Sequence, residues 1–307
     1  MRKTGKRSVL KYFQPVDMDN VMSESLFDTD DDIDNSLGHF AFQSSKNLFL
    51  NRFKPEDIMS LLTQVGLIKH LNSIGFNNIK VDIKKDENLI HHLKIYYDST
   101  IPENLLINLR VSESKFVPDK RFFEDTSEPV VLDMVIIEWL SAQKPAKNFD
   151  SEKPQLPGQS NPGLGSLNYM MELMYIVGDK LFLDGFMDIP DHLHGAVMYS
   201  RKFKFFNPSH EAVLKAILRD LKDYSLTDLS WGMITKTIID KTTGQPQVYD
   251  PSEQIFAVSK FMKDYFNSKK YRDKFSRVYK SKKYYFDYEA MVKKREELLK
   301  EKKAEEL

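Results

Sequence analysis

The chain of 307 residues has no cysteine, no excess of charge of either sign and no long apolar run. The lack of cysteine excludes disulfides, thiolate metal sites and a cysteine nucleophile. It is also typical of a protein in a reducing compartment. Lysine plus arginine and aspartate plus glutamate number 45 each, so the overall charge favours neither a nucleic acid nor an acidic partner.

No segment predicts export or membrane insertion. The N-terminus is basic, Met1-Arg-Lys-Thr-Gly-Lys-Arg, but the apolar stretch of a signal peptide does not follow it. A membrane-spanning helix needs about 18 consecutive apolar residues, and no such run occurs. We therefore expect a cytoplasmic protein without a membrane partner.

What the chain does have is material for a core, since 41% of its residues are apolar and 12% aromatic. Its pattern divides into an N-terminal arm (1–54), a core (55–208), a C-terminal extension (209–287) and a charged terminal helix (288–307). The arm contains an acidic stretch at 28–34 with the D-x-D-x-D start of a calcium loop. Ile33 stands where that loop needs glycine and His39 where it needs glutamate, so we interpret the stretch as a solvated acidic loop.

The spacing of apolar residues predicts an α/β fold. Three- and four-residue steps over 58–68 predict a helix that begins near Pro55. A segment at 130–140 with a β-branched apolar run predicts a strand buried on both faces. The remaining predicted strands cover residues 79–83, 89–97, 105–111, 180–190, 203–206 and 231–239, and the remaining predicted helices follow Gly165 or cover residues 193–202, 211–221 and 256–288.

A glycine loop at residues 155–165, Gln155-Leu-Pro-Gly-Gln-Ser-Asn-Pro-Gly-Leu-Gly165, is the feature that most suggests chemistry. It leads directly into the helix that begins near Ser166. Free N–H groups and the helix dipole make such a junction a natural anion site. The helix has no acidic residue before Glu172, and an acidic first turn would repel a phosphate. Glycine and proline are also the commonest loop residues, so a merely structural turn is the alternative.

The order strand, glycine loop, helix, strand, helix and short strand over 130–206 resembles the GNAT superfamily, the acyl-coenzyme A-dependent N-acetyltransferases. In that family a strand leads into an R/Q-x-x-G-x-G/A loop that binds the coenzyme A pyrophosphate. Gly163-Leu164-Gly165 matches its Gly-x-Gly, with Ser160 where the family has arginine or glutamine. A second, looser match at 155–160 adds Gly158 and Gln159, and Ser166 follows the loop.

A second motif of the family, N-x-x-A-x-x-x-Y, follows its next strand. The chain has His192-Leu-His-Gly195-Ala-Val-Met-Tyr199 at the same spacing, with His192 for asparagine and Gly195 for alanine. The resemblance implies a GNAT-like, mixed and mostly antiparallel central sheet flanked by helices, followed by a C-terminal α/β extension. It also implies that acetyl-coenzyme A, or another acyl-coenzyme A, is the co-substrate.

The same resemblance implies a mechanism, in which a small-molecule or peptide amine attacks the bound thioester. Glu138, in an apolar run that disfavours its charged form, is the candidate general base. Tyr199 is the candidate acid for the leaving thiolate, and a strand amide near Glu138 would polarise the thioester carbonyl. Each residue also has a structural alternative: an outward-facing carboxylate for Glu138, and for Tyr199 a packed ring with its hydroxyl at the surface.

The sequence leaves other functions open. His192 and His194 lie near Asp188 and Asp191, but the ligand set is incomplete, so we predict no metal; His192 could act on substrate instead. A GNAT-like module that binds or assembles without turnover is the first alternative. The second is nucleic-acid binding by the basic, aromatic segment 260–283, although a helix with a packed aromatic face explains that spacing more simply.

Overall fold

The computed structural model of this protein describes residues 13–15, 47–123, 129–145, 147–149 and 154–307. The acidic stretch at 28–34 lies outside the described residues. The α-helices span Pro55–Gln64 (α4), Leu67–Ser73 (α5), Leu167–Lys180 (α6), Leu193–Tyr199 (α7), Pro208–Asp220 (α8), Leu226–Ile234 (α9), Lys260–Asn267 (α10), Lys269–Ser281 (α11) and Tyr288–Glu301 (α12). Short 3-10 helices span Pro102–Asn104 (η3), Lys120–Phe122 (η4) and Ala304–Glu306 (η5).

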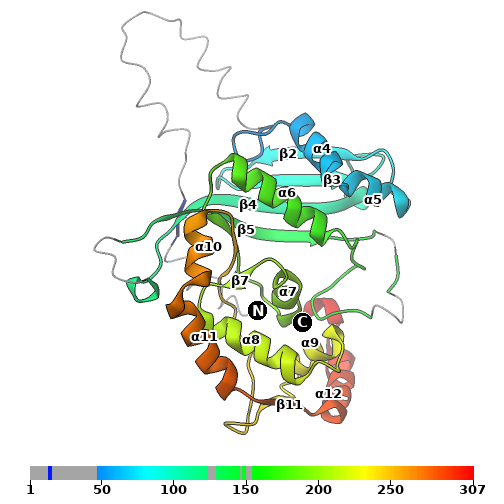
Figure 1. The fold of residues 1–307 in the computed structure, drawn as a ribbon. Helices are drawn as coiled ribbons and strands as arrows, with labels where there is room; N and C mark the ends of the chain where they lie inside the picture. The colour runs from blue at the N-terminus through cyan, green and yellow to red at the C-terminus, as the bar shows by residue number, and fades with distance from the viewer. Residues whose placement is uncertain (1–12, 16–46, 124–128, 146, 150–153) are drawn as a thin grey trace, which may run out of the picture.

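One mixed, mostly antiparallel sheet organises the fold, as the sequence predicted. Its strands are Phe13–Pro15 (β1), Lys80–Lys85 (β2), His91–Tyr96 (β3), Leu105–Phe116 (β4), Leu132–Ala142 (β5), Gly185–Asp188 (β6), Lys204–Phe205 (β7) and Gln254–Ala257 (β10). Their spatial order is β2-β3-β4-β5-β6-β10-β7, and β1 pairs with the end of β4. Among these pairs only β5 and β6 run parallel. The helices α4, α5 and α6 lie across one face of the sheet (Figure 1).

The central strand β5 is buried on both faces, which confirms the interpretation of its apolar run. Met134 belongs to the core that α10 and α11 cover, whereas its neighbour Val135 belongs to the core beneath α4, α5 and α6. Successive side chains of a strand point to opposite faces, so a strand with cores on both sides needs apolar residues at every position. Both side chains are almost fully buried, with exposed fractions of 1% and 0%.

The strand β10 lies between β6 and β7 and comes from beyond residue 208, where the sequence predicted a separate extension. Ile255 pairs with Met187 on one side and with Lys204 on the other. The backbones of β6 and β10 approach so closely that a Cβ built on Gly185 would lie 2.5 Å from the Phe256 carbonyl oxygen. The C-terminal segment therefore completes the main sheet.

Four of the predicted elements were wrong in part. The helix predicted over 58–68 is broken at Gly66, whose φ of +83° is left-handed, so α4 ends at Gln64 and α5 begins at Leu67. The segment 231–239 is not a strand, because the Ser225–Asp228 capping box begins α9 and leaves only Ile238–Asp240 as strand β8. The segment 180–190 begins with the end of α6 and a turn, so only β6 is strand. The segment 256–288 begins in β10 and contains a strand at its other end, Tyr284–Phe286 (β11).

A small antiparallel sheet lies apart from the main one, with the order β11-β8-β9, where β9 spans Gln245–Pro246. Its core side chains, Ile238, Tyr284 and Phe286, pack with residues of α7, α8, α9 and α12 in a third cluster. In Figure 1 this unit lies below the main sheet.

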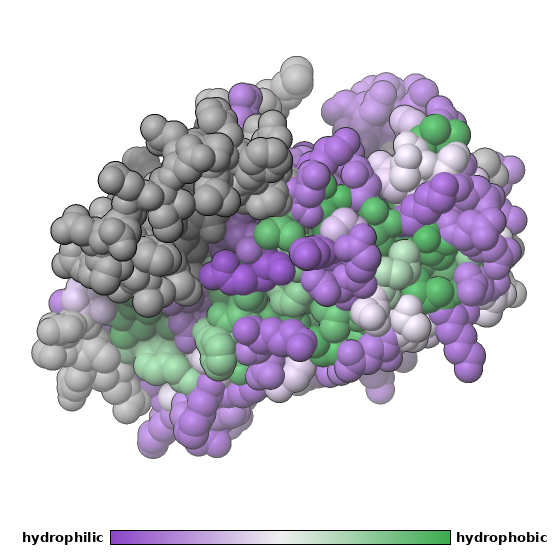
Figure 2. Space-filling model, turned by 90° about the horizontal axis from the view of Figure 1, so that it is seen from above, coloured by the Kyte–Doolittle hydropathy of each residue, from purple (hydrophilic) through white to green (hydrophobic). Residues whose placement is uncertain are grey.

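The surface mixes apolar and polar side chains. In the view from above, apolar side chains gather in the middle of the face between polar ones (Figure 2). The most exposed large apolar residue among those described is Phe182, 91% exposed, in the turn between α6 and β6. No helix within the described ranges is long and apolar enough to cross a membrane.

Candidate functional site

The candidate site begins where β5 extends past its parallel neighbour. The pairing of β5 with β6 ends at Ile136 and Met187, while β5 continues to Ala142 on its pairing with β4 alone. From Ile137 to Ser141, the edge of β5 that faces β6 has no strand partner among the described residues, and just beyond it Gln143 forms an antiparallel bridge with Gly163 of the glycine loop. Unpaired N–H and C=O groups of such an edge can pair with another extended chain.

A β-bulge lies at the start of this open edge. The register of β4 against β5 passes from Val111 opposite Ile137 to Arg110 opposite Trp139, so Glu138 is the extra residue. A bulge breaks the ladder, bends the strand and redirects a side chain, which is why bulges often lie beside active sites. Glu138 is half-buried, and the Ser112 hydroxyl donates a hydrogen bond of 2.8 Å to its Oε1.

The second half of the glycine loop is anchored at the far end of the same strand. The Leu164 N–H donates to the Ala142 carbonyl (3.2 Å), and the Lys144 N–H donates to the Pro162 carbonyl (2.8 Å). The Leu164 side chain is buried in the main core. Of the predicted anion-binding amides, that of Leu164 is therefore already used.

The residues that follow Leu164 lead into α6 with free donors. Gly165 is exposed and has φ +72°, a conformation that favours glycine. Ser166 is the N-cap residue, 1% exposed, and its hydroxyl has no hydrogen-bond partner among the described residues. The first turn of α6 contains no acidic residue, so its free N–H groups and dipole favour an anion.

Gly158 and Gln159 lie in a different environment from residues 163–166. The Gly158 N–H donates to the Ala304 carbonyl of η5 (2.7 Å), and a Cβ on Gly158 would lie 3.0 Å from His192 Nε2. Gln159 closes its own turn, since its side chain accepts from the Leu156 N–H (3.2 Å) and its carbonyl accepts from Gln155 (2.7 Å). The two halves of the predicted loop thus have separate partners.

Tyr199 and His192 occupy opposite ends of α7. Tyr199 is the last helical residue, and its ring packs 5.1 Å from that of Phe203 against the main core. Burial raises the pKa of the Tyr199 phenol well above its ordinary value, and the negative charge of Asp188 adds to this. The phenol is therefore protonated at neutral pH and can serve as a proton donor.

His192 is the N-cap residue of α7, and its ring stacks on His194 at 5.3 Å. Burial lowers the pKa of His192, with Asp191 opposing the shift, and burial lowers the pKa of His194 to about 4. Both imidazoles are neutral at pH 7. In the described ranges no three histidine, aspartate or glutamate side chains are grouped to hold a metal ion.

The two histidines border a cavity of about 270 Å³ that the sequence did not predict. Asp191, Ser230 and Tyr249 also line it. It shares Leu193, Met233, Val248 and Tyr249 with a neighbouring cavity of about 170 Å³.

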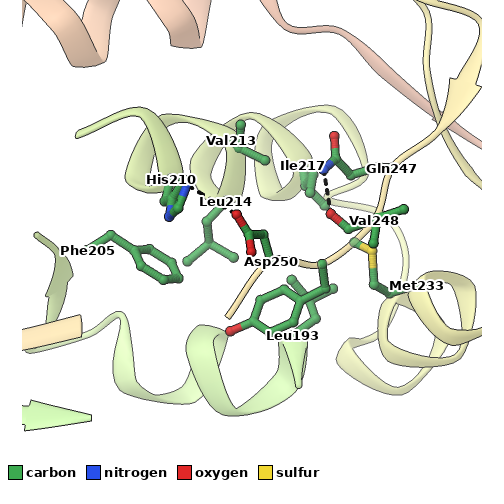
Figure 3. Close-up of a pocket in the computed structure, with 11 residues that line it drawn as sticks. Leu193, Phe205, His210, Val213, Leu214, Ile217, Met233, Gln247, Val248 and Asp250 are labelled. Carbon is green, nitrogen blue, oxygen red and sulfur yellow. Dashed lines mark hydrogen bonds and ion pairs between the residues drawn. The ribbon is translucent and has the colours of Figure 1, made fainter. Parts of the chain in front are cut away.

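Figure 3 shows the smaller cavity, with His210 and Asp250 facing each other across its rim. His210 Nε2 lies 3.6 Å from Asp250 Oδ2, and His210 Nδ1 is buried without a partner among the described residues. Forty positions separate this pair in the sequence, so no local pattern could have indicated it.

No family model, curated protein or solved structure matches this chain.

Proposed function

We propose that this protein transfers an acyl group from an acyl-coenzyme A to an amine. The observation that carries the proposal is the open edge of β5, which starts at a bulge and ends at the glycine loop. Glu138 and Ala142 lie about 13 Å apart at 3.3 Å per residue. An extended pantetheine arm has a length of this order and contains two amides that can pair with a strand edge.

The loop supports the diphosphate end of the same ligand. The amides that open α6 beyond Leu164 have no helical acceptor, since the first intrahelical donor is Met170. The glycine at 165 lets the backbone approach a phosphate closely. With the diphosphate at this end of β5, the thioester would lie toward the bulge at Glu138.

The transfer needs one group that accepts a proton and one that donates a proton. Glu138 would accept the proton of the attacking amine, directly or through a water. Tyr199, protonated at pH 7, would donate to the departing thiolate. The cavity beside Asp191 and His192 would take the acceptor, because a carboxylate attracts an ammonium group and a neutral imidazole can accept its proton.

The test is acyl transfer from acetyl-coenzyme A to a panel of amines, measured by thiol release. We expect Glu138→Gln and Tyr199→Phe each to lower kcat by about 100-fold, within the usual range for acid–base groups. Ser112→Ala is the comparison variant: it removes the hydroxyl that donates a hydrogen bond to Glu138 but keeps the Glu138 carboxylate as the base. Wild-type protein that binds coenzyme A and releases no thiol with any amine would contradict catalysis.

A module that binds acyl-coenzyme A without turnover is the second candidate. It is favoured by one observation: the Leu164 amide already donates to Ala142, so the loop offers fewer donors than the family pattern implies. Coenzyme A binding that survives in Glu138→Gln and Tyr199→Phe, with no transfer by the wild type, would decide for this candidate.

A further inference from the structure

A cavity of about 540 Å³ lies at the opposite end of β5 from the glycine loop. It is formed where η4, in the connection before β5, meets α11 and the start of α8. The 11 residues of β5 span about 33 Å, so this cavity and the glycine loop are separate. Figure 1 shows α10 and α11 on the left of the sheet and the end of β5 on the right.

The lining of this cavity is strongly cationic. Arg121, Lys270, Lys274 and Arg277 line it, with Asp273 as the one anionic lining residue. These side chains give a net charge of +3. Asp273 forms an ion pair with Lys269, which lies outside the lining.

Two of the cations have partners that leave donors for a ligand. The Lys270 ammonium donates to the Phe123 carbonyl (2.7 Å), which fixes its position. Within the described ranges its other N–H groups have no further partner and can donate to a ligand. Arg121 Nε lies 3.4 Å from Asp119 Oδ2, and both side chains are exposed, so this pair contributes little. Neither Lys274 nor Arg277 bonds to an acidic side chain within the described ranges.

The cavity has a rigid aromatic floor. The hydroxyls of Tyr265 and Tyr271 donate to the Phe206 and Phe205 carbonyls at 2.7 Å. Both tyrosines are buried, with exposed fractions of 7% and 5%. Bases of a single-stranded nucleic acid stack on exposed aromatic faces, so these two rings cannot serve that purpose.

The start of α8 contributes its dipole only. The Ser209 N–H bonds to the Asn207 side chain, and the N–H groups of His210 and Glu211 bond to the Asn207 carbonyl. The cationic side chains must therefore supply the hydrogen bonds to an anion.

We propose that this cavity binds a small organic diphosphate, such as a nucleoside diphosphate. At neutral pH the terminal phosphoryl group of such a ligand carries about −1.5 to −2 charges and the inner group carries a single charge, so together they match the net lining charge of +3. The volume lies within the range of small-molecule sites, about 300–1,000 Å³. Phe122 also lines the cavity, with the Arg121 guanidinium 5.2 Å from its ring centroid, and offers an apolar surface to the organic group.

The experiment titrates the full chain at low ionic strength with adenosine diphosphate, inorganic pyrophosphate and inorganic phosphate. We expect both diphosphates to bind at least about tenfold more tightly than phosphate. The double variant Lys274→Glu/Arg277→Glu should lose at least about tenfold in affinity for them. The control Lys280→Glu/Lys300→Glu changes the net charge equally at exposed positions outside the lining and should stay within about twofold of wild type.

A second variant, Asn168→Asp, places a negative charge in the first turn of α6 and separates this site from the glycine loop. Diphosphate binding that persists in Asn168→Asp and is lost in Lys274→Glu/Arg277→Glu supports the cavity. The reverse pattern assigns the anion to the glycine loop and overturns the inference. Three other results would also overturn it. They are an equal loss of affinity in the control variant, no binding at millimolar pyrophosphate, and a single-stranded dodecanucleotide that binds more tightly than adenosine diphosphate with a steep salt dependence.

Discussion

Acidification between pH 7 and pH 5 should destabilise this protein through His91. The side chain is 1% exposed in β3, where its Nδ1 lies 3.1 Å from the Leu50 nitrogen and 3.1 Å from the Leu48 carbonyl oxygen. Burial, together with the positive charge of Lys85, lowers the pKa of His91 from 6.5 to about 4. The fold therefore holds the neutral imidazole.

The sign and size of the effect follow from proton linkage. Between pH 6.5 and pH 4 the unfolded chain binds a proton that the folded chain does not, so stability is full above pH 6.5 and falls as the pH is lowered through this window. For these two pKa values the loss is about 2 kcal/mol at pH 5 and about 3 kcal/mol at pH 4. Other groups, including His194, add to the wild-type loss, so a variant must isolate the contribution of His91.

The assay is urea unfolding of wild type and His91→Gln at pH 7 and pH 5. Glutamine can accept the Leu50 N–H and cannot take up a proton, so the variant should lose about 2 kcal/mol less than wild type between the two pH values. Ile95→Val is the control: it lies on the same strand, costs about 1 kcal/mol and should cost the same at both pH values. If wild type and His91→Gln lose equal stability on acidification, His91 is not buried as a neutral group and the reasoning fails.

Two further changes test the packing of the fold. Gly185→Ala places a Cβ 2.5 Å from the Phe256 carbonyl oxygen. We expect this change to lower the free energy of unfolding by about 3 kcal/mol or more. A urea midpoint equal to that of wild type would show that β10 does not lie against β6. Arg219 bonds to the Asp220 carboxylate and to the Tyr279 and Lys282 carbonyls, and its guanidinium lies 4.3 Å from the Tyr279 ring centroid. Lysine cannot reproduce this set of hydrogen bonds, so Arg219→Lys should lower the free energy of unfolding by about 2 kcal/mol. The control Arg272→Lys, at an exposed position of α11, should change it by less than about 0.5 kcal/mol. Equal effects of the two changes would contradict the geometry around Arg219.

Local sequence patterns predicted two kinds of element: helices with one apolar and one polar face, and a strand with two apolar faces. The β-branched run of β5 and the three- and four-residue apolar steps of α6 and α8 each appear where expected. The helix α9 was missed because its apolar run looks like a strand. Its start signal, the capping box of Ser225 and Asp228, carries aspartate where the usual pattern has glutamate or glutamine.

Long-range pairing could not be predicted from a single sequence. The insertion of β10 between β6 and β7 depends on contacts between residues about 50 to 70 positions apart, and register is decided by both strands together. The same limit applies to the site. Glu138 is a bulge residue only because of the register of β5 against β4. The Leu164 N–H cannot bind an anion because it donates to the Ala142 carbonyl, and the Gly158 N–H donates to η5.

Coenzyme A titration of wild type and Asn168→Asp decides whether the first turn of α6 holds the diphosphate. Asn168 is exposed in the first turn of α6, where an aspartate favours the helix dipole by about 0.3–1 kcal/mol and repels a diphosphate. We expect wild type to bind coenzyme A, and Asn168→Asp to be at least as stable as wild type but to bind about tenfold more weakly. Folded wild-type protein without detectable binding at millimolar coenzyme A, or equal affinity of the two proteins, would show that this turn does not hold the diphosphate.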